Sequence, residues 1–209
     1  MATLYDAELS PSKSELLSQW LPTQPWFIQD ATELRRLAAF RFDDPAGEVG
    51  IETHVVGVGG RIYQVPLTYR GAPLAGAEKY LITTMEHSVL GARWVYDATA
   101  DPVYVHELAA ALLVGKPAAS ENLVVNDGLK HVAPTALLSR TGAPETEVPE
   151  LQIGAPQTSN SVTTIPAGVL NLVVLRELNT AGVLHSDTTL KLSWDGQEIP
   201  LVIAAANPA

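Results

Sequence analysis

The side chains best suited to acid–base or metal chemistry are the histidines, of which the chain has five. No two of them have the i,i+2 or i,i+4 spacing that places two ligands on one strand face or one helix face. The chain has no cysteine, which excludes disulfides, zinc–thiolate centres and thiol nucleophiles. Walker loops, Gly-x-Ser-x-Gly elbows and zinc-protease helices are also absent. We therefore expect no cofactor, no metal site and no catalytic residue. The histidines are His54, His87, His106, His131 and His185.

One group of residues with mixed chemistry flanks a turn between two predicted strands. Glu86, His87 and Arg93 border this turn, and Tyr96 follows in the second strand. Donors, acceptors and an aromatic ring together suit a sugar or an acidic ligand, and loops on a rigid sheet commonly carry function. These four residues are the candidate ligand-binding residues. An ordinary solvated turn would contain the same residue types, so both interpretations stay open.

Charge and hydropathy limit the classes of partner. The chain has 209 residues, with 23 acidic against 13 basic residues and a formal net charge of −10. A nucleic-acid binder needs clustered cations to displace counterions from phosphates, and no basic cluster occurs. The same sign of charge disfavours anionic membrane surfaces. Met1–Ser10 lacks the apolar run of a signal peptide, and no segment resembles a membrane helix. We expect a cytoplasmic protein that binds neither nucleic acid nor membranes.

Capping patterns predict two helices. Ser12 and Glu15 have capping-box spacing, in which the two residues satisfy each other's backbone amides, and Pro22 stops the helix soon afterwards. The second helix has Asp101 as its N-cap and Pro102 as its first residue. Its buried stripe consists of Val105, Leu108, Ala109, Leu112 and Leu113.

Period-2 alternation predicts an antiparallel sheet in the first half of the chain. The predicted strands are Leu37–Asp43, Val49–Val58, Arg61–Arg70, Leu81–Glu86 and Ala92–Asp97. In the second of these, Glu52 and His54 share the face opposite Ile51 and Val55. Gly57–Gly60 predicts a hairpin turn and not a phosphate-binding loop, because a strand and not a helix follows it. We interpret residues 1–117 as an α+β subdomain, a curved antiparallel sheet covered by helices.

The second half of the chain, residues 118–209, is predicted to be a mostly antiparallel β subdomain. The stretch 139–160 is rich in Gly, Pro, Ser and Thr and is predicted to be a long loop. The predicted strands are Glu121–Val125, Leu129–Val132, Ser161–Ile165, Val169–Arg176, Thr188–Trp194 and Glu198–Ala204.

Specific runs in the first half are similar to known proteins. The runs are Trp20-Leu21, Trp26-Phe27, Tyr63–Leu67 and Arg93–Ala98 leading to Asp101-Pro102. With these runs, residues 10–115 resemble the amino-terminal cap subdomain of maltokinases and related sugar kinases. Phe42–Glu52 and Val65–Leu74 are more similar to small stand-alone actinobacterial proteins that are maltokinase cap-like and of unknown function. The resemblance implies a cystatin-like fold, and it implies no chemistry because the cap of those kinases carries none of their catalytic residues.

The second half shows a weaker resemblance. Gln157–Val162 and Leu170–Leu178 resemble the first two strands of a sugar-kinase amino-terminal lobe. In maltokinases that second strand carries a lysine that holds the nucleotide phosphates as a point charge, and Val173 takes its place here. His185-Ser186-Asp187 is similar to the His-Gly-Asp of phosphotransferase catalytic loops, but the next residues read as a strand, which favours a turn. The resemblance therefore implies a degenerate kinase-lobe segment without nucleotide binding.

These observations together predict a non-catalytic interaction or regulatory protein on a maltokinase cap-like scaffold, with a possible link to α-glucan or amino-sugar metabolism. Its partner would be a kinase, a glucan enzyme or a second copy of the chain. One alternative is a small-molecule, sugar-like binding protein that uses the concave face of the sheet. A further alternative is an enzyme of unknown type, for which Glu86, His87 and Asp97 would have to converge.

Overall fold

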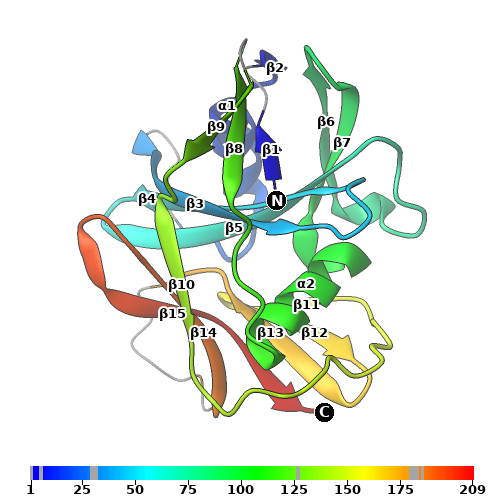
Figure 1. The fold of residues 1–209 in the computed structure, drawn as a ribbon, viewed down its shortest axis with the longest axis vertical. Helices are drawn as coiled ribbons and strands as arrows, with labels where there is room; N and C mark the ends of the chain where they lie inside the picture. The colour runs from blue at the N-terminus through cyan, green and yellow to red at the C-terminus, as the bar shows by residue number, and fades with distance from the viewer. Residues whose placement is uncertain (1, 5–6, 29–32, 126–127, 179–183, 185) are drawn as a thin grey trace.

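The computed structural model describes residues 2–4, 7–28, 33–125, 128–178, 184 and 186–209. In this part of the chain, two six-stranded sheets and one three-stranded sheet account for most of the structure, together with two α-helices (Figure 1). Nearly all strand pairs are antiparallel. The α+β class is consistent with this arrangement, with β structure predominating.

The first six-stranded sheet contains the five strands predicted for the first half of the chain and one short strand that was not predicted. Gly59 and Gly60 adopt positive φ angles in the turn between β4 (Gly50–Val58) and β5 (Arg61–Arg70), as the predicted hairpin requires. The unpredicted strand, β2, has only two residues, too few for any periodic pattern. In spatial order the strands are β2 (Leu9–Ser10), β6 (Leu81–His87), β7 (Gly91–Asp97), β5 (Arg61–Arg70), β4 (Gly50–Val58) and β3 (Arg35–Asp43).

Both helices begin where the capping patterns predict. Helix α1 spans Lys13–Trp20, and the reciprocal Ser12–Glu15 capping box is formed. Helix α2 spans Pro102–Leu113, with the Asp101 carboxylate accepting from the Val103 amide at 3.0 Å. The short 3-10 helices are η1 (Leu21–Thr23), η3 (Glu78–Tyr80) and η4 (Ala98–Ala100).

The second six-stranded sheet lies in the carboxy-terminal half. The predicted loop over 139–160 is too long, because Ser139 and Arg140 belong to β10 and Gln157–Ser159 forms β11. All three β11 residues are exposed, so no apolar alternation marks the strand in the sequence. In spatial order the strands are β10 (Ala136–Arg140), β14 (Thr188–Trp194), β15 (Gln197–Pro208), β13 (Leu170–Leu175), β12 (Val162–Ala167) and β11 (Gln157–Ser159).

The small third sheet joins the amino terminus to the middle of the chain. Strands β8 (Glu121–Val125) and β9 (Gly128–Val132) form the predicted hairpin, whose turn residues 126–127 lie outside the described residues. The unpredicted strand β1 (Ala2–Leu4) pairs with β8 in parallel. This pairing crosses the boundary at residue 117 between the two predicted subdomains.

Two apolar cores hold the sheets and helices together. One core lies between the first sheet, α2 and the second sheet, and it combines side chains such as Phe40, Leu108 and Leu192. The other core lies on the opposite face of the first sheet, where Leu17 of α1 packs near Tyr63 of β5. Figure 1 shows α1 on one side of the first sheet and α2 with the second sheet on the other. Because both faces are covered, the central strand β4 is buried from its second residue to its last.

Candidate functional site

Three of the four candidate residues gather at the β6–β7 hairpin. His87 ends β6, and its Nδ1 accepts from the amides of Val89 and Leu90 at 3.2 and 3.1 Å. Arg93 of β7 pairs with Met85 of β6, and its guanidinium donates to the Leu90 carbonyl at 2.6 Å. Partial burial and the nearby Arg93 cation lower the pKa of His87. These contacts make His87 and Arg93 braces of the hairpin turn, with Glu86 exposed beside them.

The fourth candidate, Tyr96, lies apart from this turn. Its ring is buried, and its hydroxyl accepts from the Leu74 amide at 2.8 Å, which anchors the loop before β6. Asp97 lies at the far end of β7 and bonds to Thr99 and Arg176. The constellation of Glu86, His87 and Asp97 that the enzyme alternative requires therefore does not form.

A shallow depression of about 470 Å³ lies beside Glu86 and His87. Its remaining lining comes from the segment around β2 and from the hairpin, and it includes Glu8, Leu9 and Ser88. The Glu8 amide donates to the Ser88 hydroxyl at 3.0 Å, so the two segments are bonded to each other beside the depression. The two carboxylates at the rim favour a cationic or hydrogen-bond-donating group over an anion.

A second group of polar side chains, which sequence reasoning did not identify as a cluster, is buried beneath α1. The Glu52 carboxylate contacts Lys13 of α1 and lies 3.1 Å from the Arg41 guanidinium. The His54 Nε2 lies 3.6 Å from Glu52 and 3.2 Å from the Tyr69 hydroxyl. The sequence correctly places Glu52 and His54 on one face of β4. The alternation of Glu52 and His54 within a mostly apolar strand was the sequence signal that could have indicated a cluster. The sequence does not show that this face is covered, because the cover comes from tertiary packing.

Burial and charge set the protonation of this cluster in opposite directions. Burial lowers the pKa of His54 to about 4, against the attraction of Glu52, so the ring is neutral at pH 7. Burial alone would raise the pKa of Glu52, but the charges of His54, Arg41 and Lys13 lower it well below its usual range. Burial and Glu52 raise the pKa of Tyr69 well above its usual value. The His54 ring is fully buried, so the cluster is sealed and a substrate cannot reach it without displacement of α1.

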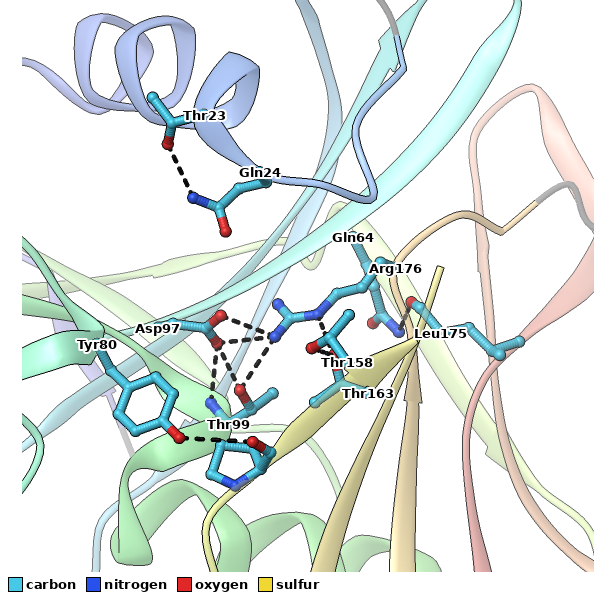
Figure 2. A network of polar contacts seen from close by, with 11 residues as sticks. Thr23, Gln24, Gln64, Tyr80, Asp97, Thr99, Thr158, Thr163, Leu175 and Arg176 are labelled. Atoms are coloured by element: carbon cyan, nitrogen blue, oxygen red, sulfur yellow. Dashed lines mark hydrogen bonds and ion pairs between the residues drawn. The ribbon is translucent and has the colours of Figure 1, made fainter. Parts of the chain in front are cut away.

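A third polar network joins the two large sheets (Figure 2). The Arg176 guanidinium, 1% exposed, donates to both Asp97 carboxylate oxygens at 3.0 and 2.8 Å and to the Thr99 hydroxyl at 3.0 Å. Its Nε donates to the Thr163 hydroxyl at 2.8 Å, and its guanidinium carbon lies 5.2 Å from the centre of the Trp26 ring. Arg176 follows β13, whereas Asp97 ends β7, so this buried ion pair ties the second sheet to the first.

Comparison with protein families assigns the segment that carries these groups. Residues 20–101 match the model of the maltokinase N-terminal cap domain. This segment is therefore similar to the maltokinase N-terminal cap domain. The matched segment runs from Trp20, the last residue of α1, to Asp101, the N-cap of α2. It contains Glu52, His54 and the four candidate ligand-binding residues. No curated protein matches the chain.

Arg176, Val173 and the rest of the second sheet lie outside the matched cap domain, so their resemblance to a kinase lobe stays a prediction. Val173 is 7% exposed and pairs with Thr164 and Ala205 on neighbouring strands, where it presents no cation to a ligand. His185 lies outside the described residues. The Ser186 hydroxyl donates to the carbonyls of Thr188 and Ala206 at 3.0 and 2.9 Å, as expected for a turn before β14.

No three histidine or acidic side chains in the described part of the chain gather as metal ligands would. Likewise, no helix among the described residues is long and apolar enough to cross a membrane.

Proposed function

We propose that this protein is a non-catalytic interaction or regulatory module built on the maltokinase cap scaffold. The observation that supports this proposal is the fate of the groups that could do chemistry. Glu52 and His54 are buried beneath α1, and Asp97 and Arg176 form a buried ion pair between the sheets. A catalytic acid, base or nucleophile has to reach a substrate, and these four side chains have almost no exposed surface.

The proposal includes the finer expectations that follow from the family resemblance. We take the first sheet with α1 as a cystatin-like unit and the second sheet as a degenerate kinase-lobe segment. By analogy with maltokinases, the partner would be a kinase or another enzyme of α-glucan or amino-sugar metabolism, or a second copy of the chain.

The alternative of a sugar-like ligand on the concave sheet face has less support. Side chains of α2 and the second sheet fill the face of the first sheet that carries Phe40 and Ile51. Small-molecule sites are usually enclosed pockets, whereas the two hollows described on this structure, of about 470 and 690 Å³, are open depressions.

Calorimetry with Mg-ATP tests the absence of a nucleotide site. We expect no heat of binding, because Val173 supplies no phosphate-anchoring charge. The variant Val173→Lys should remain inactive as a kinase, because the metal ligands and catalytic base of a phosphotransferase are not present in this sequence pattern. A micromolar dissociation constant for Mg-ATP would overturn the proposal.

Affinity capture tests the interaction role. The full-length tagged chain, expressed in its native host, should retain a kinase or glucan enzyme in near-stoichiometric amount. An unrelated tagged protein of similar size and negative charge is the matched control. Recovery of the same proteins with both baits, or of none with this chain, would contradict an interaction role.

A further inference from the structure

Strand β6 lies beside the two-residue edge strand β2, so most of its outer side is unpaired among the described residues. Of its seven residues, only Glu86 and His87 pair with β2. Of the other five, Leu81, Thr83, Thr84 and Met85 pair with β7 on one side, and Ile82 lies at a β-bulge. No strand in the described part of the chain pairs with Leu81–Met85 on the other side. A row of backbone donors and acceptors is therefore available along this edge.

The chain leaves this edge open because β2 ends at Ser10. Pro11 follows, which has no amide to donate, and α1 then begins at Lys13. At the other end of the open edge, the chain enters β6 through the 3-10 helix η3. The opening is thus bounded by β2 on one side and by η3 on the other.

The residues of this open edge lack the charged and proline side chains that often block pairing. Natural edge strands are often blunted by lysine, proline, a β-bulge or a covering loop. Leu81–Met85 contains neither a charged residue nor a proline, and its irregularity is the bulge at Ile82. At the opposite edge of the same sheet, other segments cover β3. The Ala119 amide donates to the Arg41 carbonyl at 2.8 Å, and the Thr135 hydroxyl donates to the Ala39 carbonyl at 3.0 Å.

We propose that the Leu81–Met85 edge binds an extended segment of a partner protein as an added strand, with a basic residue of that segment against Glu8 and Glu86. This inference rests on the proposed interaction role and names its surface. Strand addition takes its affinity from main-chain hydrogen bonds and its specificity from side-chain contacts beside the strand. Ile82 and Met85 pack into the core beneath the edge, which holds β6 in place for pairing.

Charge and exposed apolar surface indicate what the segment carries. Glu8 and Glu86 are both exposed and line the depression where β2 meets β6, and the whole chain has a net charge of −10. A lysine or arginine at that end of the segment would be attracted to them. Val89 and Leu90, at the hairpin beyond, are 54% and 43% exposed and offer apolar contacts. The segment is therefore expected to be apolar or β-branched with a basic flank.

A second copy of the chain fits this edge less well than a partner segment. Five residues of strand extend about 17 Å. Pairing two folded chains along so short an edge buries less than the ~800 Å² per partner that a stable protein interface needs. Two copies would also bring Glu86 of each chain and two net charges of −10 towards each other. A short extended segment avoids both problems.

Three synthetic peptides test the proposal on the full-length protein. The first alternates threonine and valine and is flanked by lysines, the second has glutamates in place of the lysines, and the third is the lysine peptide with prolines at alternate positions. We expect the first to bind best and to slow hydrogen exchange within Leu81–Met85, and the proline peptide not to bind. Absence of binding by the lysine peptide, equal binding by the proline peptide, or protection elsewhere in the chain would each overturn the proposal.

Charge reversal tests the basic flank. The double variant Glu8→Lys, Glu86→Lys should lower the affinity for the lysine peptide by about tenfold. It should also bind the glutamate peptide more tightly than the lysine peptide. Glu198→Lys, an exposed change in the second sheet, is the matched control and should leave binding unchanged. Equal effects of the double variant and this control would refute the role of Glu8 and Glu86.

The same variants separate this inference from the proposed function. If the double variant still captures a near-stoichiometric partner in the native host, the edge is the wrong surface although the interaction role stands. If the unmodified chain captures no partner while the peptides still bind at Leu81–Met85, the interaction role fails although the edge is competent.

Discussion

Replacing Arg176 by methionine should destabilise the protein by about 3–5 kcal/mol, the usual cost of breaking a buried ion pair by removing one partner. Methionine keeps an unbranched side chain of similar length but removes every donor. The Asp97 carboxylate, whose side chain is 12% exposed, then keeps only its bonds from Thr99 and loses its cation. The Thr163 hydroxyl loses the Arg176 donor as well and keeps its bond with the Thr158 hydroxyl.

Urea titration monitored by circular dichroism and tryptophan fluorescence measures this loss. Trp26 lies against the Arg176 guanidinium, so its emission reports on the same region. Arg93→Met is the control for charge removal, because Arg93 donates only to the exposed hairpin carbonyl of Leu90, and it should cost less than about 1 kcal/mol. Moderate salt should change the Arg176 effect little, since buried pairs are weakly screened.

A double-mutant cycle with Asp97→Asn isolates the pair. Because Arg176 and Asp97 bond directly, their effects should be non-additive by about 1–3 kcal/mol. A loss for Arg176→Met no larger than that for Arg93→Met, or strict additivity with Asp97→Asn, would refute the view that this ion pair holds the two sheets together.

Three further outcomes are expected. Asp101→Ala should lower the free energy of unfolding by about 2–3 kcal/mol, more than the roughly 1 kcal/mol of a helix cap alone. The excess is expected because the Asp101 carboxylate also accepts two bonds of 2.7 Å from the largely buried Arg70. Urea titration checks this beside Leu108→Ala, for which we expect a loss of about 2–5 kcal/mol. The folded-state pKa of His54, about 4, lies below its unfolded value of 6.5. The free energy of unfolding should therefore fall by about 3 kcal/mol as the pH drops from 6.5 to 4. Urea titrations at pH 7, 5.5 and 4.5 should show that His54→Gln lacks this component of the pH dependence. A fragment of residues 1–117 should be less stable than the full chain and one of 118–209 poorly folded, since both halves contribute to one core; two well-separated melting transitions of the full chain would contradict this.

Local patterns in the sequence predicted the elements well. The capping box at Ser12 and Glu15, the Asp101 N-cap and the glycine turn between β4 and β5 depend only on residues a few positions apart. Such interactions have the same geometry in any fold, so spacing alone reveals them. The family resemblance of the cap segment likewise rested on contiguous runs, and the match over residues 20–101 confirms it.

The short strands were the main elements that local sequence patterns did not predict. Strands β1, β2 and β11 have two or three residues each, which is too short for alternation to stand out, and they exist because a neighbouring strand supplies their hydrogen bonds. The open edge of β6 depends on the same information. The residue pattern of Leu81–Met85 does not reveal that β2 pairs only with the last two residues of β6.

The sequence by itself determined where helices begin, where the chain turns and which residues of β4 share a face. Only the tertiary structure decided that the face with Glu52 and His54 is covered by α1, and that Arg176 meets Asp97, 79 positions away. The physical reason is range. Capping and alternation act between neighbours in the chain, whereas burial and ion pairing act between elements that only packing brings together, and they decide which polar residues remain available for function.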